Sequence, residues 1–117
     1  MSEFYTKIFI NSDRRPTSLL DDLESRLGGH VDLGTLCVDS FEVDVRDNRD
    51  MPTTTDNKDD AFLSYAVTAE VVAVSDATKA HYLDFVGRVM HALHACGAEV
   101  VAASDWEHEL PGGGKLP

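Results

Sequence analysis

The chain has 117 residues, of which 43% are hydrophobic, so it is long enough to form one globular domain whose core needs no disulfide or metal. Its 21 acidic and 10 basic residues give a formal net charge of −11, which repels the phosphates of nucleic acids and anionic lipids and excludes both as expected partners. It contains no run of about 18 apolar residues and begins without a secretion leader, so we expect a cytoplasmic protein without a membrane span.

Residues 4–10 predict the first strand, because hydrophobic residues recur at every second position. The face expected to be buried is formed by Phe4, Thr6, Ile8 and Ile10. The other face carries Tyr5 and Phe9 beside Lys7, so it is not purely polar, and we expect part of it to be covered.

An amphipathic helix is predicted over residues 19–27. The leucines that share one helical face are Leu19, Leu20, Leu23 and Leu27. Ser18 is expected to cap the helix at its N-terminus, and Gly28 and Gly29 are expected to end it, since glycine readily takes the left-handed backbone of a helix C-terminus.

Residues 30–47 follow a two-residue period that is typical of a half-buried strand. In its second half the residues Phe41, Val43 and Val45 alternate with Glu42, Asp44 and Arg46. Leu36 and Val38 lie in the opposite phase to Phe41, which either a bulge near residues 39–40 or two separate short strands would explain.

A long polar connection is predicted over residues 47–60, where Met51 is the one apolar side chain, and we expect it to be mobile. Residues 62–74 form the longest predicted strand. Because Val67, Ala69 and Val71 alternate with Thr68 and Glu70, one face of this strand is expected to be more polar than the other.

The second helix is predicted to open at Ser75 or Asp76 and to run to about Ala95, with a broad apolar stripe along it. A final strand is predicted over residues 98–104. We therefore expect a single α+β domain over residues 1–111, followed by a flexible, glycine-rich tail over residues 112–117.

The predicted order of elements is β-α-β-β-α-β, which is typical of a ferredoxin-like α+β sandwich with two helices on one face of the sheet. Right-handed connections predict an antiparallel sheet in the strand order 4-1-3-2. The second strand would then lie at an edge, where Glu42, Asp44 and Arg46 are the charges expected to prevent pairing with another chain.

Metal and nucleophile chemistry are weakly supported. His81, His91 and His94 do not have the i, i+4 spacing of a helical zinc pair, and Arg88 near them opposes a cation, so we expect a solvated helix face and no metal. Cys37 and Cys96 are 59 residues apart and match no metal or redox spacing, so we expect two buried, reduced thiols. Without a phosphate-binding or dinucleotide-binding glycine motif, no cofactor is expected.

The segment DWEHELP at residues 105–111 combines acids with the only tryptophan. On an extended chain, Asp105, Glu107 and Glu109 would share one face, with Trp106 on the other. Paired carboxylates serve catalysis only in an enclosed site, and a segment beside a glycine tail offers little enclosure, so we expect no catalytic residue here.

Recognition of a protein partner is the function that the charge favours. Residues 39–60 contain eight acids and three bases, and residues 99–109 contain four acids and no base. The predicted partner-binding residues are Asp105, Trp106, Glu107, Glu109, Glu42 and Asp44. Such a surface attracts a basic protein and speeds its association.

Residues 82–111, YLDFVGRVMHALHACGAEVVAASDWEHELP, resemble the C-terminal part of small bacterial proteins that end in a D-[WF]-E-x-E-L-P motif. This resemblance covers about a quarter of the chain and implies no catalytic residue. In general build, the short acidic α/β chain is similar to immunity proteins of bacterial toxin systems. That similarity implies a non-enzymatic inhibitor that covers the basic substrate groove of a toxin.

An alternative from another class stays open at this point. A dimeric ferredoxin-like domain would use its open sheet face for a small ligand or a substrate, with Tyr5, Phe9, Phe62 and Ala66 lining a cavity between protomers. A monomer favours the inhibitor and a tight dimer favours the cavity. A third possibility is a purely structural subunit of a larger complex.

Overall fold

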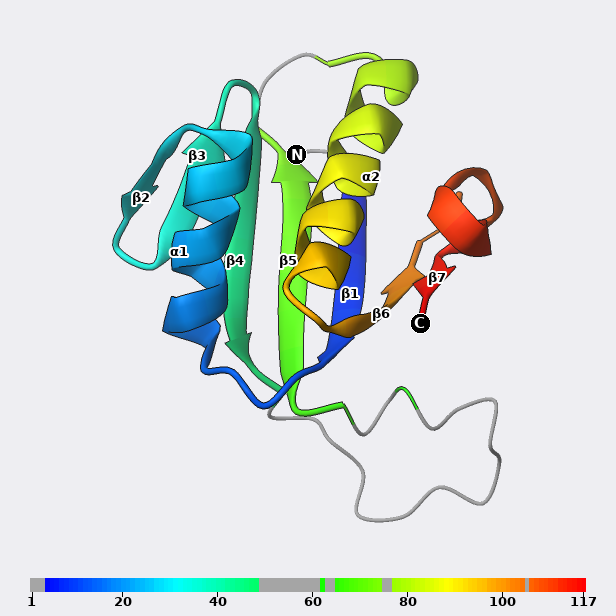
Figure 1. Ribbon diagram of the computed structural model, residues 1–117. Helices are drawn as coiled ribbons and strands as arrows, with labels where there is room; N and C mark the ends of the chain where they lie inside the picture. Colours follow the sequence, from blue (N-terminus) through cyan, green and yellow to red (C-terminus); the bar gives the residue numbers. More distant parts are fainter. Residues whose placement is uncertain (1–3, 49–61, 63–64, 75–76, 105) are drawn as a thin grey trace.

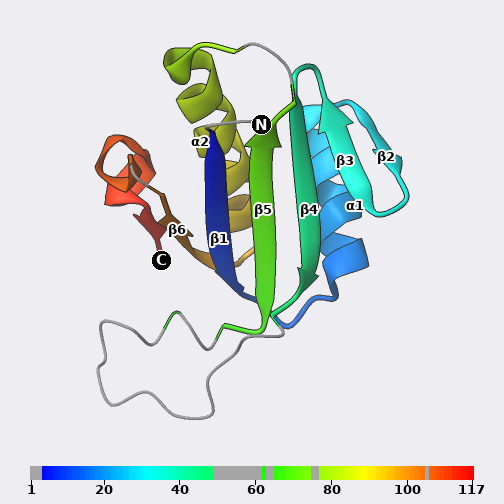
Figure 2. The same cartoon turned by 180° about the vertical axis from the view of Figure 1, so that it is seen from behind.

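The computed structural model describes residues 4–48, 62, 65–74, 77–104 and 106–117. Within these residues, helices α1 (Pro16–Leu27) and α2 (Lys79–Ala95) lie side by side on one face of a single antiparallel sheet. The view from behind shows the strands in front and both helices beyond them (Figure 2). The α+β class predicted from the sequence is confirmed.

The sheet has seven strands in the order β2-β3-β4-β5-β1-β6-β7 (Figure 1). Their bounds are β1 Tyr5–Asn11, β2 His30–Asp32, β3 Thr35–Val38, β4 Phe41–Asp47, β5 Val67–Ala73, β6 Glu99–Ala103 and β7 Lys115–Leu116. The predicted order of four strands, 4-1-3-2, does not match this sheet, because short strands extend it at both sides.

The segment over residues 30–47, predicted as either one strand with a bulge or two short strands, forms three strands, β2, β3 and β4. Two tight turns divide it, and both contain a residue with positive φ that is not glycine: Leu33 at 53° and Asp39 at 51°. The alternative of separate strands for Leu36 and Phe41 is therefore the correct one. The prediction that Glu42 lies on an edge strand is wrong, because β4 pairs with β3 on one side and with β5 on the other.

The helix starts also differ from the sequence prediction. α1 begins at Pro16 with Arg15 as its N-cap, so Ser18 lies inside the helix instead of capping it. Proline favours the first position of a helix because its backbone nitrogen has no hydrogen to leave unpaired. α2 is capped by Thr78, whose Oγ1 accepts a hydrogen bond from the backbone N–H of His81 at 3.1 Å; the predicted caps, residues 75 and 76, lie outside the described residues.

The core lies between the helices and the sheet. The buried residues on the helix-facing side of the four long strands include Ile8, Ile10, Val43, Val67, Ala69, Val71 and Val100. Leucines of α1 and the apolar stripe of α2 pack onto this face. The buried face predicted for residues 4–10 is the one observed. The strand predicted over residues 62–74 is observed as β5, which begins only at Val67, with Val67, Ala69 and Val71 toward the helices.

The C-terminal segment has a defined path that the sequence did not predict. Glu107–Glu109 (η2) and Pro111–Gly113 (η3) form short 3-10 turns, and β7 pairs with β6 where a flexible tail was expected. The backbone N–H of Ala102 donates to the carbonyl oxygen of Gly114 at 2.7 Å, and Leu110 is buried. Among the described residues, neither helix is long and apolar enough to cross a membrane.

Candidate functional site

The face of the sheet opposite the helices carries a row of carboxylates. Asp44 on β4 lies directly opposite Glu70 on β5. On the other side of Asp44, Thr35 on β3 is its direct opposite, and Thr35 in turn lies opposite Asp32 on β2. Residues directly opposite one another in an antiparallel sheet point to the same face. Glu42 points to this face too, since its neighbours Phe41 and Val43 point into the core. We call Asp32, Glu42, Asp44 and Glu70 the acidic face.

Asp44 has two polar neighbours within the acidic face. Its Oδ1 accepts a hydrogen bond from the hydroxyl of Thr35, and its Oδ2 lies 3.6 Å from a guanidinium nitrogen of Arg46. Lys7 on β1 lies opposite Glu70 on the side away from Asp44, and its ammonium lies 5.3 Å from the ring centre of Phe9. Arg46 therefore lies beside Asp44, and Lys7 lies beyond Glu70. No basic residue lies between Asp44 and Glu70 themselves.

The carboxylates of the acidic face contribute to the raised pKa values of two neighbouring side chains, Cys37 and Tyr5. Burial and the nearby carboxylates of Glu42, Asp32 and Asp44 raise the pKa of the Cys37 thiol, which is half-buried on β3. Burial and the carboxylate of Glu70 likewise raise the pKa of Tyr5. Burial is the larger cause in both cases, and the neighbouring carboxylates act in the same direction, since both disfavour a thiolate or a phenolate.

The predicted C-terminal group is built differently from the sequence expectation. Asp105 lies outside the described residues. Glu107 and Glu109 belong to the 3-10 turn η2, so they do not share a face as on an extended strand. Glu109 binds the ammonium of Lys79 at 2.8 Å, and this hydrogen bond lowers the pKa of its carboxyl group. The two described acids of this segment therefore do not form the carboxylate ladder that was expected.

Trp106 serves the packing of the C-terminal segment. Its ring centre lies 5.4 Å from that of Phe4 and 6.4 Å from that of Tyr82, and the ammonium of Lys79 lies 5.5 Å from the indole. The side chain is half-buried. Cation–π and ring contacts of this kind attach the segment to α2 and to Phe4, the residue before β1.

The two predicted groups of site residues do not meet. Glu42 and Asp44 point away from the helices on β4, whereas η2 packs beside α2 at the other side of the sheet (Figure 1). Strands β5 and β1 lie between β4 and β6. Of the described residues that the sequence predicted for the site, only Glu42 and Asp44 belong to the acidic face. The sequence prediction missed the other two members, Asp32 and Glu70.

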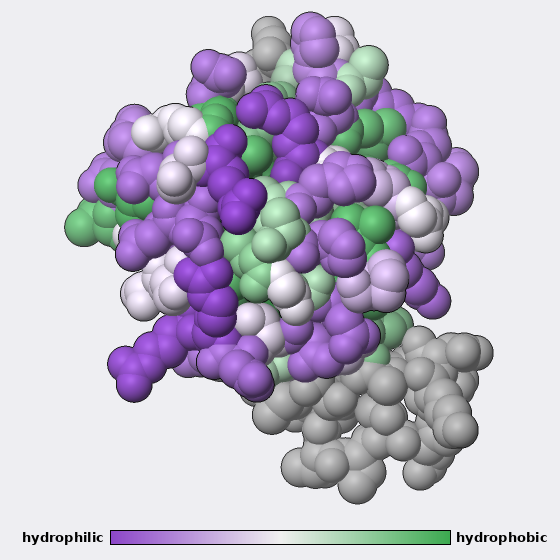
Figure 3. Space-filling model, viewed as in Figure 1, coloured by the Kyte–Doolittle hydropathy of each residue, from purple (hydrophilic) through white to green (hydrophobic). Residues whose placement is uncertain are grey.

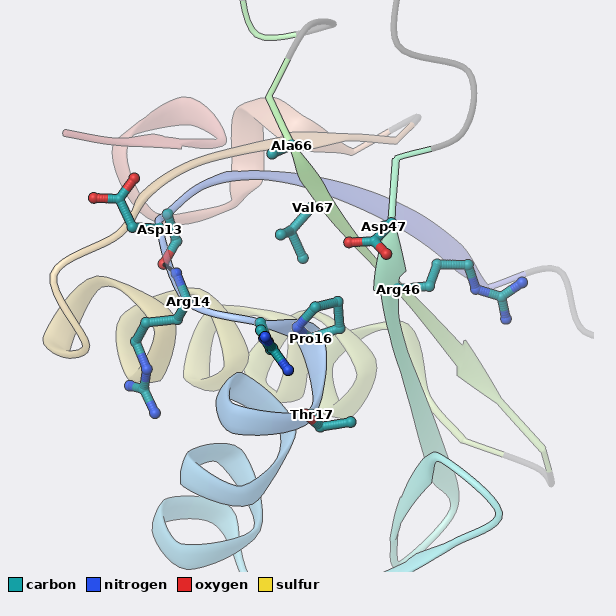
Figure 4. Close-up of a pocket in the computed structure, with 10 residues that line it drawn as sticks. Asp13, Arg14, Pro16, Thr17, Arg46, Asp47, Ala66 and Val67 are labelled. Atoms are coloured by element: carbon teal, nitrogen blue, oxygen red, sulfur yellow. Dashed lines mark hydrogen bonds between the residues drawn. The ribbon is translucent and has the colours of Figure 1, made fainter.

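A hollow of about 880 Å³ lies where the loop after β1 meets the end of β4, and three arginines line it. Arg14 and Arg46 point away from each other and away from the hollow (Figure 4). Arg14 binds the carboxylate of Asp22 and the carbonyl oxygen of Ser18, the latter at 3.0 Å. The guanidinium groups do not converge on one point, so this hollow does not have the geometry of an anion site.

A smaller hollow of about 280 Å³ lies between the β3–β4 turn and α2. Asp39, His81, Asp84 and Arg88 line it above the stacked rings of Phe41 and Phe85. In the described part of the chain, no three side chains of His, Cys, Asp or Glu lie close enough together to hold a metal ion. Cys37 and Cys96 are both free and half-buried, not fully buried as expected.

Hydrophilic residues cover most of both helices, and hydrophobic residues show mainly between them (Figure 3). Comparison of the chain with protein-family models, with curated proteins and with solved structures finds no match.

Proposed function

We propose that the protein is a non-enzymatic acidic domain of the cytoplasm that binds a basic protein through the acidic face of its sheet. In its most specific form it is an immunity-type inhibitor that covers the basic groove of a bacterial toxin. The observation that carries this proposal is the direct opposition of Asp44 and Glu70 on neighbouring strands. It is supported by the row of carboxylates that continues from this pair, with Asp32 and Glu42 on the same face.

Two carboxylates directly opposite on a sheet destabilise the folded protein, because their side chains start only about 4.5–5.5 Å apart. Lysines or arginines of a partner placed over Asp44 and Glu70 would relieve this repulsion on binding. The same charges would speed the encounter, and they would reject an acidic competitor. The repulsion between Asp44 and Glu70 that lowers the stability of the free protein would thus be offset by the partner's positive charges in the complex.

The fold places this surface in the open. We propose that the four long strands, β4-β5-β1-β6, which are consecutive in the sheet, form a ferredoxin-like unit with α1 and α2. The short strands β2, β3 and β7 extend this unit at its two edges. Both helices pack on one face (Figure 2). Among the described residues of the other face, Phe9 and Thr68 are buried, whereas Asp32 is exposed and Glu42, Asp44 and Glu70 are partly exposed, so the acidic face is the part open to a partner.

The test compares two variants of equal net charge. Glu42→Lys with Asp44→Lys changes the acidic face, whereas Asp21→Lys with Asp84→Lys changes exposed residues of the helices. Proteins retained by the wild-type chain from the cells that make it are identified, purified and titrated by calorimetry at two salt concentrations. We expect only the first variant to lose affinity and salt dependence. Equal affinity and equal salt dependence of the first variant and the wild type would contradict the proposal.

A dimer with a ligand cavity remains the alternative. The observation in its favour is an aromatic region on the same face, where Phe9 packs edge-on against Phe62 at 5.1 Å and Tyr5 is 46% exposed. Light scattering after size-exclusion chromatography separates the two proposals. A tight dimer that buries Tyr5 favours the cavity, and a monomer favours the inhibitor.

A further inference from the structure

The tip of the β2–β3 hairpin exposes a large hydrophobic side chain. Leu33 is 99% exposed, whereas the other exposed large hydrophobic residues of the described chain, Tyr5 and Val74, are 46% and 54% exposed. Figure 3 shows hydrophobic atoms at the left edge of the molecule, where Figure 1 places this hairpin. The side chain of Leu33 therefore contributes almost no burial to the core.

The backbone at this position is unfavourable for leucine. Leu33 and Gly34 form a two-residue turn with φ values of 53° and 84°, so both residues have the left-handed backbone of a type I′ hairpin. Asparagine and glycine suit these positions, and a branched apolar residue does not. The fold gains from Leu33 neither burial nor a relaxed backbone, which indicates a role outside the fold.

The hairpin is held firmly to the rest of the domain. A Cβ atom at Gly29, just before β2, would lie 2.1 Å from the carbonyl oxygen of Cys37, so the backbones pack in direct contact there. The outer edge of β2 is occupied as well, because the backbone N–H of Val31 donates to Glu24 Oε2 at 3.0 Å. A partner would therefore contact the tip of a rigid hairpin. Because this hairpin is already ordered in the free protein, its binding costs little conformational entropy.

Leu33 stands at the end of the acidic face. Asp32 precedes it in sequence, and the row continues from Asp32 through Thr35 and Asp44 to Glu70. We infer that Leu33 is an apolar anchor that enters a hydrophobic pocket of the partner, and that the partner carries lysines or arginines beside this pocket. The inference rests on the proposed function, which supplies the basic partner. An aromatic or aliphatic anchor that fills a pocket of the partner contributes much of the binding energy of an interface.

The first test locates the contact. The full chain carries the photo-crosslinking residue p-benzoylphenylalanine at position 33 in the cells that make the protein, and a control chain carries it at position 25, on the exposed side of α1. We expect position 33 to crosslink to one protein in which lysine and arginine outnumber aspartate and glutamate. Crosslinks to lipid, or equal yields from positions 33 and 25, overturn the inference.

The second test measures the contribution of the side chain with the purified crosslinked protein as the probe. We expect Leu33→Asn and Leu33→Ala to weaken binding by at least about tenfold with an unchanged salt dependence. Val74→Asn, at an exposed site off the hairpin, is the control and should bind like the wild type. If both Leu33 variants bind with the affinity of the wild type, the inference that Leu33 is an anchor is overturned.

Asp44→Lys separates this inference from the function on which it rests. If Asp44→Lys loses affinity and the Leu33 variants do not, the acidic face stands and the anchor is overturned. If the Leu33 variants lose affinity and Asp44→Lys does not, the anchor stands and the charge-based function is overturned.

Discussion

The hydroxyl of Tyr82 on α2 lies 2.7 Å from Oγ1 of Thr6 on β1 and donates a hydrogen bond to the carbonyl oxygen of Val71 at 2.8 Å. Both side chains are completely buried, so this pair is a polar contact inside an apolar core. It fixes α2 above the two central strands at a single position along them. Because water cannot reach the pair, the protein itself must satisfy each of these polar atoms.

Replacement of Tyr82 by phenylalanine should therefore destabilise the protein by about 1–3 kcal/mol, because Thr6 loses a buried partner. Burial raises the pKa of Tyr82 from 10.0 to about 12. A group whose pKa is raised in the folded state contributes stability that is fully present below the unfolded pKa and is lost as the pH rises toward the folded one. Urea unfolding should show wild-type stability falling between pH 10 and pH 12, and falling less steeply in Tyr82→Phe. Parallel pH profiles of the two proteins would contradict this role for Tyr82.

Much of the scaffold was predictable because its hydrophobic periods are long and regular. The strand period of residues 4–10 and the apolar stripe of the second helix each gave the observed buried face. The phase change between Leu36 and Phe41 marked the break near Asp39, but nothing marked the turn at Leu33, because leucine rarely takes a positive φ. For that reason β2 was not expected as a separate strand.

The candidate site was predictable only in part, since it depends on strand register. The alternation in β4 correctly placed Glu42 and Asp44 on the face away from the core. That Glu70 lies opposite Asp44 follows from long-range pairing, which no local pattern contains. For the C-terminal acids, an extended chain was assumed where the segment folds into 3-10 turns, so alternation in sequence did not become a common face.

Glycine at position 29 should be indispensable for the hairpin that follows α1. Gly29 has a φ of 81°, and a Cβ there would lie 2.1 Å from the carbonyl oxygen of Cys37. Gly28 is the matched control, because its φ is 82° and nothing lies within 4 Å of its Cβ position. Gly28→Ala should cost about 1–3 kcal/mol of backbone strain. Gly29→Ala should cost several kcal/mol more, since the strand backbone must move. Equal unfolding midpoints of the two variants in urea would show that the backbone at Cys37 moves away from position 29 at little cost.

Leu33→Asn should stabilise the free protein even where it weakens partner binding. Asparagine tolerates the left-handed backbone, so we expect a gain of about 1 kcal/mol and a rise of roughly 4 °C in Tm. Leu33→Ala removes the exposed side chain but keeps the unfavourable backbone, and should leave Tm nearly unchanged. Differential scanning calorimetry measures both. A lower Tm for Leu33→Asn would mean that the leucine side chain contributes to the fold after all.

The opposition of Asp44 and Glu70 should appear as a repulsive coupling energy in a double-mutant cycle. Asp44→Asn and Glu70→Gln each remove the whole repulsion, whereas the double variant removes it only once. The double variant should therefore be less stable than the sum of the single effects predicts, by about 0.2–1 kcal/mol. The cycle cancels the separate contacts of Asp44 with Thr35 and of Glu70 with Tyr5, because each is lost equally in the single and double variants. Since mobile ions screen exposed charges, the coupling should shrink when urea unfolding is repeated at high salt. A coupling energy of zero at low salt would show that Asp44 and Glu70 do not repel each other. A basic partner would then have no repulsion to relieve, contrary to the proposed function.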